Sequence, residues 1–367
     1  MSEPGPPAQM GGGRSAASPA ASAMELEMSE TLLGEGRAPA KVILVGEHAV
    51  VYGQPAIALP VPGLEARARV FAIAAGPTRL LAQFPSAESR PPLELDLLAA
   101  ADDEPLAAAA RAALRYAGRT ERTPWRIELT SQVPSGRGLG SSAAVAAAVV
   151  RAVGAAAEQD WDAQTVADLA LEGERRAHGR PSGIDNTVVA FGRPIRFQQG
   201  RAEPLVVGAP LCFLVADSGR RGATSELVAR VREASEARPG TYAGWFARIG
   251  QLVDDAATAI ARGNASRLGR LMDLDHLILQ AMRVSTPELD ALVAAARGAG
   301  ARGAKLAGSG GGGAIIALVD ADGAAAVRAA LIGAGAVDLI QVDLSATGAD
   351  ADADRVSAAP GAPGGPA

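Results

Sequence analysis

The chain of 367 residues is long enough for two domains, each with a sizeable core. Its 48% hydrophobic residues exclude a disordered protein, and a net charge of -5 without a basic block argues against a nucleic-acid partner. The single cysteine, Cys212, excludes an internal disulfide and suits a reducing cytosol. The apolar run over 143–150 is too short to cross a bilayer, so we expect no membrane span.

The two ends of the chain differ in composition from its middle. Residues 1–36 are rich in Gly, Pro, Ala and Ser and lack the apolar stretch of a signal peptide, which predicts a disordered leader. Residues 345–367 are also predicted to form a disordered tail. Between the ends we expect an N-terminal domain over 37–204 and a C-terminal domain over 205–344.

Strand and helix patterns alternate along the middle of the chain. Asp162 is expected to cap a helix over 163–177, and Thr286 before a proline and an acid is a well-formed helix start. The remaining expected elements are strands at 41–45 and 127–133, a helix at 141–157, a strand at 210–215, helices at 224–236, 244–262 and 265–282, strands ending at 305 and over 314–319, a helix at 322–334 and a strand at 338–342. The final strand–helix–strand order indicates that a second α+β domain begins near residue 205.

Residues 134–144, PSGRGLGSSAA, join an expected strand to the long Ala/Val helix. A glycine-rich turn that opens a helix gathers backbone N–H groups and the positive end of the helix dipole, which together bind phosphate. The segment is neither a Walker A loop nor a dinucleotide fingerprint, because Gly-Lys-Ser/Thr is absent and the glycine spacing differs. A nucleotide phosphate is the expected ligand, and a plain helix entry with a capping serine is the alternative. The residues expected to bind the nucleotide are Pro134, Ser135, Gly136, Arg137, Gly138, Leu139, Gly140, Ser141 and Ser142.

Two further segments strengthen the nucleotide hypothesis. They are APAKVILVGEHAVVYG at 38–53 and GAKLAGSGGGGAIIALV at 303–319. With the loop at 134–144, in this order, they resemble the three motifs of the GHMP kinase superfamily. A fourth segment, EGERRAHGRPSGIDN at 172–186, resembles the mevalonate kinases within that superfamily. The sequence departs from the family pattern at three small residues: Ala40 stands where glycine is common, and Ala307 and Ser309 stand where threonine and alanine are common.

The resemblance, which spans about 37–342, implies both a fold and an activity. The implied fold is a two-domain α+β fold, with a ribosomal-S5-like α/β N-terminal domain and a ferredoxin-like C-terminal domain. The implied activity is transfer of the γ-phosphoryl group of ATP, with Mg²⁺, to the 5-hydroxyl of (R)-mevalonate, a small-molecule substrate. A cytoplasmic homodimer is implied as well, with neither a nucleic acid nor a membrane as partner.

The resemblance also assigns roles to individual residues. It makes Asp185 the group that takes or orients the proton of the acceptor hydroxyl, with the Lys41 ammonium beside it. Ser142 and Glu174 match the metal ligands; Glu172 competes with Glu174, and since the two lie about 200° apart around a helix only one can face the site. The ordinary alternative for Asp185 is an acid that complements a helix dipole.

The acceptor side of the implied site is less sharply defined. Glu47, His48 and Thr224 match acceptor-side positions. The alternative for His48 is a polar residue that is hydrogen-bonded to the backbone, and the alternative for Thr224 is an ordinary strand-to-helix loop. Only two of the 35 basic residues are lysines, Lys41 and Lys305, and both lie in glycine-containing motifs. We expect both to lie beside a reacting hydroxyl or phosphate.

Three other functions remain open from the sequence. A kinase of the same superfamily could act on another small hydroxy acid or sugar, because pocket shape sets the acceptor. A catalytically inactive ligand sensor would bind ATP without turnover. A decarboxylase acting on a phosphorylated mevalonate would release CO₂.

Overall fold

The computed structural model describes residues 31–84, 92–178, 181–222 and 224–347. Its larger sheet has the strand order β4–β3–β5–β2–β6–β7, with β1 paired to β2 beside this path. The strands of this sheet are β1 (Leu32–Val45), β2 (Ala56–Ala72), β3 (Arg79–Gln83), β4 (Leu93–Asp96), β5 (Trp125–Ser131), β6 (Ile195–Gln198) and β7 (Arg201–Pro204). The β3–β5 pair is parallel and the other pairs are antiparallel.

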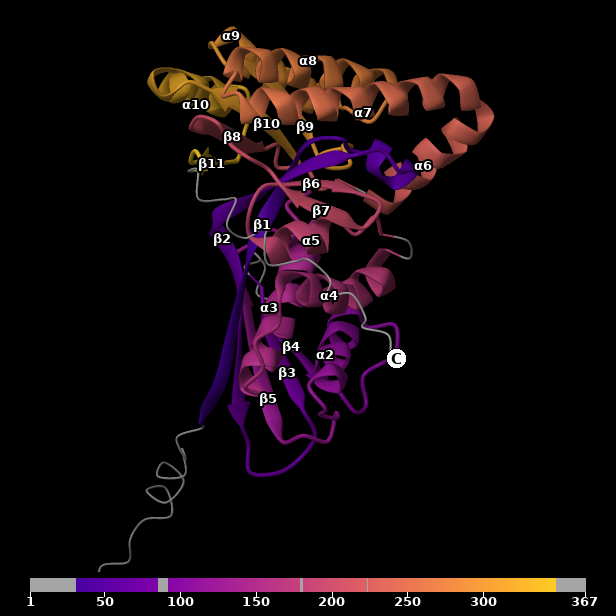
Figure 1. Cartoon of the computed structure of the whole chain (residues 1–367), viewed down its shortest axis with the longest axis vertical. Helices are drawn as coiled ribbons and strands as arrows, with labels where there is room; N and C mark the ends of the chain where they lie inside the picture. The colour runs from indigo at the N-terminus through magenta and orange to yellow at the C-terminus, as the bar shows by residue number, and fades with distance from the viewer. Residues whose placement is uncertain (1–30, 85–91, 179–180, 223, 348–367) are drawn as a thin grey trace, which may run out of the picture. The chain divides into compact units, whose positions relative to one another are not determined.

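Four helices accompany this sheet: α2 (Pro105–Tyr116), α3 (Ser141–Ala156), α4 (Ala163–His178) and α5 (Ile184–Phe191). The Ala/Val run over 143–150 is buried on every side, so α3 is the central helix. It packs on β1 and β2, and α4 packs on α2, α3 and α5. Figure 1 shows these helices gathered beside the long strands β1 and β2.

The smaller sheet is antiparallel, with the order β11–β8–β10–β9. Its strands are β8 (Leu211–Asp217), β9 (Gly303–Ala307), β10 (Ala314–Val319) and β11 (Asp338–Leu344), and its helices are α6 (Thr224–Ala237), α7 (Pro239–Ala261), α8 (Ala265–Ala281), α9 (Pro287–Gly298) and α10 (Ala324–Gly333). In Figure 1, α7 to α10 lie over one face of this sheet. Two short 3₁₀ turns complete the order, η1 (Ala49–Tyr52) and η2 (Ala321–Gly323). No helix within the described ranges is long and apolar enough to cross a membrane.

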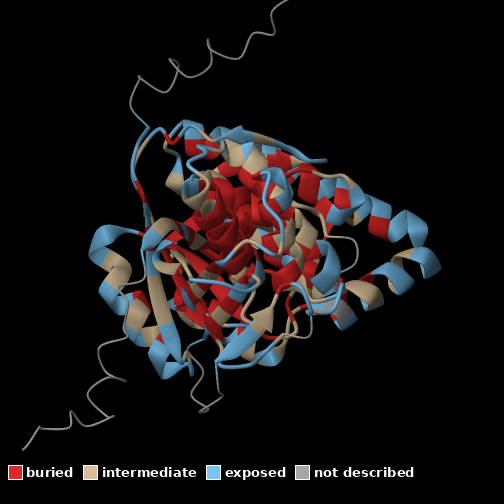
Figure 2. Ribbon diagram, turned by 90° about the horizontal axis from the view of Figure 1, so that it is seen from below, coloured by how far each residue is buried: buried red, intermediate tan, exposed pale blue. Residues whose placement is uncertain are grey.

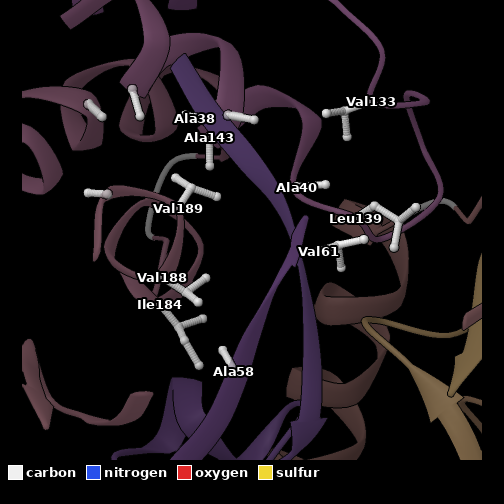
Figure 3. Packing of buried hydrophobic residues seen from close by; sticks show 14 of the residues in the cluster. Ala38, Ala40, Ala58, Val61, Val133, Leu139, Ala143, Ile184, Val188 and Val189 are labelled. Atoms are coloured by element: carbon white, nitrogen blue, oxygen red, sulfur yellow. The ribbon is translucent and has the colours of Figure 1, made fainter. Parts of the chain in front are cut away.

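Small apolar residues fill the core. Figure 2 shows the buried residues concentrated in the interior, and most of those from β1, β2 and α3 are Ala, Val, Leu or Ile. A second buried cluster joins β8 to β10 with α7, α8 and α9. Figure 3 shows Ala38 and Ala40 of β1 among the apolar side chains that surround this strand. Such close packing of small side chains brings backbones near one another, which is what the site requires.

The first strand corrects the predicted leader. Residues 32–36 belong to β1 and pair with β2, where Gly36 faces Ala68. The glycines that suggested a flexible segment serve close packing instead: a Cβ on Gly34 would lie 2.3 Å from Ala156 N, and one on Gly36 would lie 2.3 Å from Ala148 O. Residues 1–30 and 348–367 of the predicted leader and tail lie outside the described residues.

The expected elements around the site are confirmed, with shifted ends. Asp162 accepts from Thr165 N at 2.7 Å and opens α4, and α7 begins five residues earlier than predicted. The chain changes from the larger sheet to the smaller one between Pro204 and Leu211, near the expected boundary. The boundary itself stays a prediction, because residues from Leu32 onward pack as one compact unit. The predicted α+β class is confirmed, and its strands form two sheets.

Candidate active site

The loop between β5 and α3 forms a helix entry that leaves its N–H groups open. Gly136, Gly138 and Gly140 have φ angles of 74°, 76° and 72°, which glycine adopts without steric cost. Gly140 is the N-cap of α3, and no side chain in the described part of the chain caps this helix. The Ser141 hydroxyl does not cap the helix; it donates to the Val133 carbonyl at 3.1 Å. The first turn of α3 therefore presents backbone donors to an anion.

The side chains of this loop differ in what they offer a ligand. Leu139 is buried in the core, so only its backbone is available. The Arg137 guanidinium lies 3.2 Å from the Asp217 carboxylate on β8, so it anchors the loop to the smaller sheet. The hydroxyl-bearing residues Ser135 and Ser142 are exposed. The assignment of the nine loop residues to nucleotide binding stays a prediction.

The glycine run after β9 packs against the same loop. A Cβ on Gly308 would lie 3.4 Å from Gly138 Cα. Gly311 N donates to Val284 O at 2.8 Å, and Gly313 N donates to Arg220 O at 2.7 Å. Neighbouring segments therefore hold this run in place.

The loop after β8 completes this arrangement. Gly222 N donates to Gly136 O at 3.2 Å, and Ser218 N donates to Gly313 O at 2.9 Å. Backbone hydrogen bonds thus connect it both to the phosphate loop and to the glycine run. Segments around residues 136, 220 and 310 therefore meet at one place in the fold.

Lys41 on β1 and Asp185 on α5 form an ion pair, with 2.8 Å between Nζ and Oδ1. They meet because α5 packs on the first two strands: Figure 3 shows Ile184 and Val188 beside Ala58. The Lys41 side chain is 3% exposed and the Asp185 side chain is 35% exposed. Asp185 is therefore open on one side and held by a buried cation on the other. The expected proximity of the two residues is confirmed, and their catalytic roles stay a prediction.

The fourth motif segment turns into α5 at a glycine. Gly183, with a φ of 88°, is the N-cap of this helix. The hydroxyl of the preceding residue, Ser182, accepts a hydrogen bond from Ile184 N at 3.4 Å. Gly179 and Arg180 lie outside the described residues.

Burial separates the two candidate metal ligands on α4. Glu174 is 3% exposed, whereas Glu172 lies at the surface and pairs with Arg175. Because Glu174 is buried on a helix that packs on both α3 and α5, it is the better of the two candidates for a metal site near these helices. No group of three or more His, Cys, Asp or Glu side chains that could hold a metal occurs in the described ranges. A carboxylate and the Ser142 hydroxyl are hard oxygen donors, which suits Mg²⁺ completed by phosphate and water.

Glu47 and Lys305 correct the expectation drawn from their motifs. Lys305 is 0% exposed, and its ammonium contacts the Glu47 carboxylate, which is 1% exposed. Asp275 on α8 is the third member, with 3.3 Å between its Oδ2 and the Lys305 Nζ. An ammonium enclosed by two buried carboxylates does not reach a hydroxyl or a phosphate. Glu47, expected beside the acceptor, likewise turns its carboxylate into the interior.

The other two acceptor-side residues meet at Ser309 in the glycine run. His48 Nε2 lies 2.9 Å from the Ser309 carbonyl, and Thr224 Oγ1 lies 2.9 Å from the Ser309 hydroxyl. Since a carbonyl only accepts, His48 Nε2 carries the proton. Burial lowers the pKa of His48, so its ring is neutral and Nδ1 is an acceptor. Contact with an acceptor substrate stays a prediction for both residues.

Sequence reasoning assigned no role to Asp275 or His276. His276 Nδ1 accepts from Leu306 N at 3.3 Å, and its Nε2 lies 3.3 Å from Asp290 Oδ1. Burial, with the nearby Lys305 and Arg297 cations, lowers the pKa of His276 to about 4. An acid and a histidine on the apolar face of a predicted helix are the only signal that the sequence carries for them.

Because the Asp275 carboxyl is buried, we expect the free energy of unfolding to depend on pH. Burial raises the pKa of its carboxyl from 3.8 to about 7; the Glu47 charge adds to this and Lys305 opposes it. A group whose pKa is higher in the native state than in the unfolded state contributes fully to stability at a pH below its unfolded-state pKa. This contribution is lost as the pH rises through its native-state pKa. Asparagine cannot ionise. As pH rises from about 4 to 8, we therefore expect the free energy of unfolding of Asp275→Asn to increase relative to that of the wild type, by about 1–4 kcal/mol.

Denaturant unfolding of the two proteins across that pH range measures this difference. Asp273→Asn is the matched control, because Asp273 lies two residues away on the same helix, pairs with Arg297 and accepts from Ala304 N at 3.0 Å. A difference between Asp275→Asn and the wild type that stays constant with pH would contradict the prediction.

Comparison with known proteins agrees with the fold and the order of the motifs. The family model for the N-terminal domain of GHMP kinases matches residues 105–193, and the model for the GHMP kinase C-terminal domain matches residues 256–337. The first match contains the phosphate loop and Asp185, and the second contains Asp275 and the glycine run. The chain belongs to the GHMP kinase family.

Within this family, similar proteins are mevalonate kinases. The mevalonate kinase of Pyrococcus horikoshii is 39% identical over 300 residues, which cover 77% of this chain and 87% of that protein. That of Pyrococcus abyssi is 38% identical over 296 residues, with the same coverage. The crystal structure of L. major mevalonate kinase in complex with R-mevalonate is 25% identical, covers 88% of this chain and 98% of that one, and has a TM-score of 0.74.

Proposed function

We propose that this protein is a mevalonate kinase, which transfers the γ-phosphoryl group of ATP to the 5-hydroxyl of (R)-mevalonate. The observation that carries the proposal is the Lys41–Asp185 pair, in a chain 39% identical to a mevalonate kinase. In the reaction, the bond between the γ-phosphorus and the β–γ bridging oxygen breaks and a bond to the 5-oxygen forms. The hydroxyl proton leaves toward a carboxylate or solvent, and ADP is the leaving group.

The nucleotide phosphates bind at the start of α3. The uncapped first turn supplies N–H donors and the positive end of the helix dipole. The Gly136, Gly138 and Gly140 backbones can approach the phosphates because no side chain stands in the way. Contact with the glycine run, through Gly308, supports the loop from the other half of the chain.

Asp185 and Lys41 act on the acceptor hydroxyl. The exposed side of Asp185 accepts the hydroxyl proton or orients the hydroxyl toward the γ-phosphorus. The Lys41 ammonium, nearly excluded from water, stabilises negative charge on the transferred group more strongly than an exposed cation would. Lys41 is fixed by packing and holds Asp185 through the ion pair, so little reorganisation is needed.

Glu174 and Ser142 are the residues that would hold Mg²⁺. When bound, the ion neutralises charge on the β- and γ-phosphates. We expect Glu174→Gln to raise the Mg²⁺ concentration needed for half-maximal rate by at least about tenfold, since a neutral amide is a weaker ligand. Glu172→Gln, two residues away and at the surface, should leave that concentration unchanged. Mg²⁺ titrations of both variants at saturating ATP test this; equal effects would remove Glu174 from the metal site.

The acceptor is tested with a panel of substrates. ADP release is followed with purified protein, ATP and Mg²⁺ in the presence of mevalonate, homoserine, galactose or phosphomevalonate, and with EDTA in parallel. Turnover with mevalonate alone, giving a product phosphorylated on its primary hydroxyl, supports the proposal. Turnover with another acceptor overturns the substrate and keeps the family; nucleotide binding without turnover supports a sensor; CO₂ release supports a decarboxylase.

Location and assembly complete the proposal. We place the enzyme in the cytoplasm without nucleic-acid partners, supported by the single, free Cys212 and the acidic net charge. The homodimer is proposed on the family resemblance alone. Light scattering at several concentrations would show the dimer or replace it with another assembly.

A further inference from the structure

Lys305, Glu47 and Asp275 form a completely buried ionic group, named here the Lys305 cluster. The three side chains are 0–1% exposed. Lys305 Nζ contacts Glu47, lies 3.3 Å from Asp275 and donates to the Leu306 carbonyl at 2.6 Å. The members come from three separate segments: the turn before η1, helix α8 and strand β9.

The Lys305 cluster is a poor way to gain stability. Removing an ammonium and two carboxylates from water costs free energy that their attraction only partly returns, and apolar residues of similar size often stabilise a fold better. Several buried oxygens, among them Glu47 Oε2 and Asp275 Oδ1, have no hydrogen-bond partner in the described part of the chain. Such an arrangement is more useful for fixing one geometry than for adding stability.

The geometry fixed by the Lys305 cluster is that of His48 against Ser309. Glu47 directly precedes His48, and Lys305 lies four residues before Ser309. The Glu47–Lys305 ion pair and the His48–Ser309 hydrogen bond are therefore two links between the same two segments. One segment leads from β1, which carries Lys41, and the other opens the glycine run.

His48 needs such support because of its backbone. Its φ of 60° and ψ of -49° lie where a residue other than glycine is strained. A strained backbone persists only where its surroundings hold it. Three contacts hold the backbone of His48: Val51 N donates to its carbonyl at 3.1 Å, its ring binds the Ser309 carbonyl, and the neighbouring Glu47 side chain is fixed by Lys305.

We propose that Lys305 is a positioning residue: through Glu47 it holds His48 in its strained conformation, with Nε2–H on Ser309 and Nδ1 left to accept a hydrogen bond. Lys305 thus acts on the acceptor side of the site without touching a ligand. The kinetic part of this proposal rests on the proposed kinase function, and the structural part does not.

The test removes the charge of Lys305 with Lys305→Met. Long-range ¹H–¹⁵N spectra report the tautomer of each imidazole, and with three histidines in the chain His48 is assigned from the spectra of His178→Gln and His276→Gln. In the wild type we expect His48 to carry its proton on Nε2 and to titrate below the ordinary histidine pKa, because burial lowers its pKa. In Lys305→Met we expect a mixture of tautomers and titration near the ordinary histidine pKa of about 6.5.

Steady-state kinetics give the second readout. We expect Lys305→Met to lower kcat/KM for the acceptor at least about tenfold, while the Kd of an ATP analogue changes less than about threefold. Asp273→Asn is the matched control, because Asp273 also joins α8 to β9 without touching Glu47. It should lower stability and leave both His48 and the acceptor kinetics unchanged.

If Lys305→Met does not fold, Lys305→Met/Glu47→Gln replaces it, since this pair removes one charge of each sign from the interior. A folded variant in which the His48 tautomer and the acceptor kcat/KM are those of the wild type overturns the proposal. If the wild type phosphorylates no acceptor, the proposed function fails, and the imidazole spectra still decide the role of Lys305.

Discussion

Asp185→Asn is expected to lower kcat by about 10²–10⁴-fold, the usual contribution of a positioned proton acceptor. Asparagine keeps the shape of the side chain but cannot take a proton, and it removes the negative charge 2.8 Å from the Lys41 ammonium. Since Asp185 is not part of the phosphate loop, the Kd of an ATP analogue should change less than about threefold. Steady-state kinetics with the best acceptor, together with nucleotide titration, measure both quantities.

The control for Asp185→Asn is the same change at another helix start. Asp162→Asn alters the cap of α4, where Asp162 accepts from Thr165 N at 2.7 Å. Asparagine caps nearly as well as aspartate, so stability should change by less than about 1 kcal/mol and kcat should not change. If Asp185→Asn behaves like this control, Asp185 merely complements the dipole of α5, and the catalytic assignment is wrong.

The local parts of the site could be predicted from the sequence. The turn at 134–142 and the start of α4 at Asp162 depend on residues close together in the chain. The local sequence is therefore enough to predict each of them. The pairing of Lys41 with Asp185 was predictable only because the resemblance supplied the order of motifs. Periodicity alone would leave Asp185 as an acid in the first turn of a helix.

The long-range parts could not be predicted in the same way. Glu47 and Lys305 are 258 positions apart, and nothing in either segment marks a charge that will be buried. A charged residue in a ligand-binding motif is expected to face the ligand. Here each of the two motifs also contains a charged residue that joins it to the other motif. Gly34 and Gly36 led to the opposite error: they were predicted to be disordered but lie in a strand packed against a helix. Close helix packing and a flexible linker both favour glycine, so the residue type does not distinguish them.

Gly140→Ala is expected to lower kcat at least about a hundredfold without altering any catalytic side chain, because small displacements of a reacting group have effects of this size. A Cβ at position 140 would lie 2.6 Å from Lys41 Cγ and 2.9 Å from Lys41 Cε. The Lys41 stem is almost fully buried, so it cannot move aside without carrying its ammonium away from Asp185. Thermal unfolding and steady-state kinetics of the same preparation separate the loss of stability from the loss of rate.

Gly118→Ala separates backbone strain from displacement of Lys41. Gly118 has a φ of 70°, close to the 72° of Gly140, but a Cβ there would meet nothing within 4 Å. Both variants should lose about 1 kcal/mol from placing alanine in the left-handed region, and only Gly140→Ala should lose activity. Equal activity in the two variants would mean that Lys41 tolerates displacement, and its ammonium would then not be the fixed cation that the transferred phosphoryl group requires. A rate loss confined to Gly140→Ala would instead show that glycine at the start of α3 has two roles. It leaves room for the Lys41 side chain, and it lets the backbone approach the phosphate.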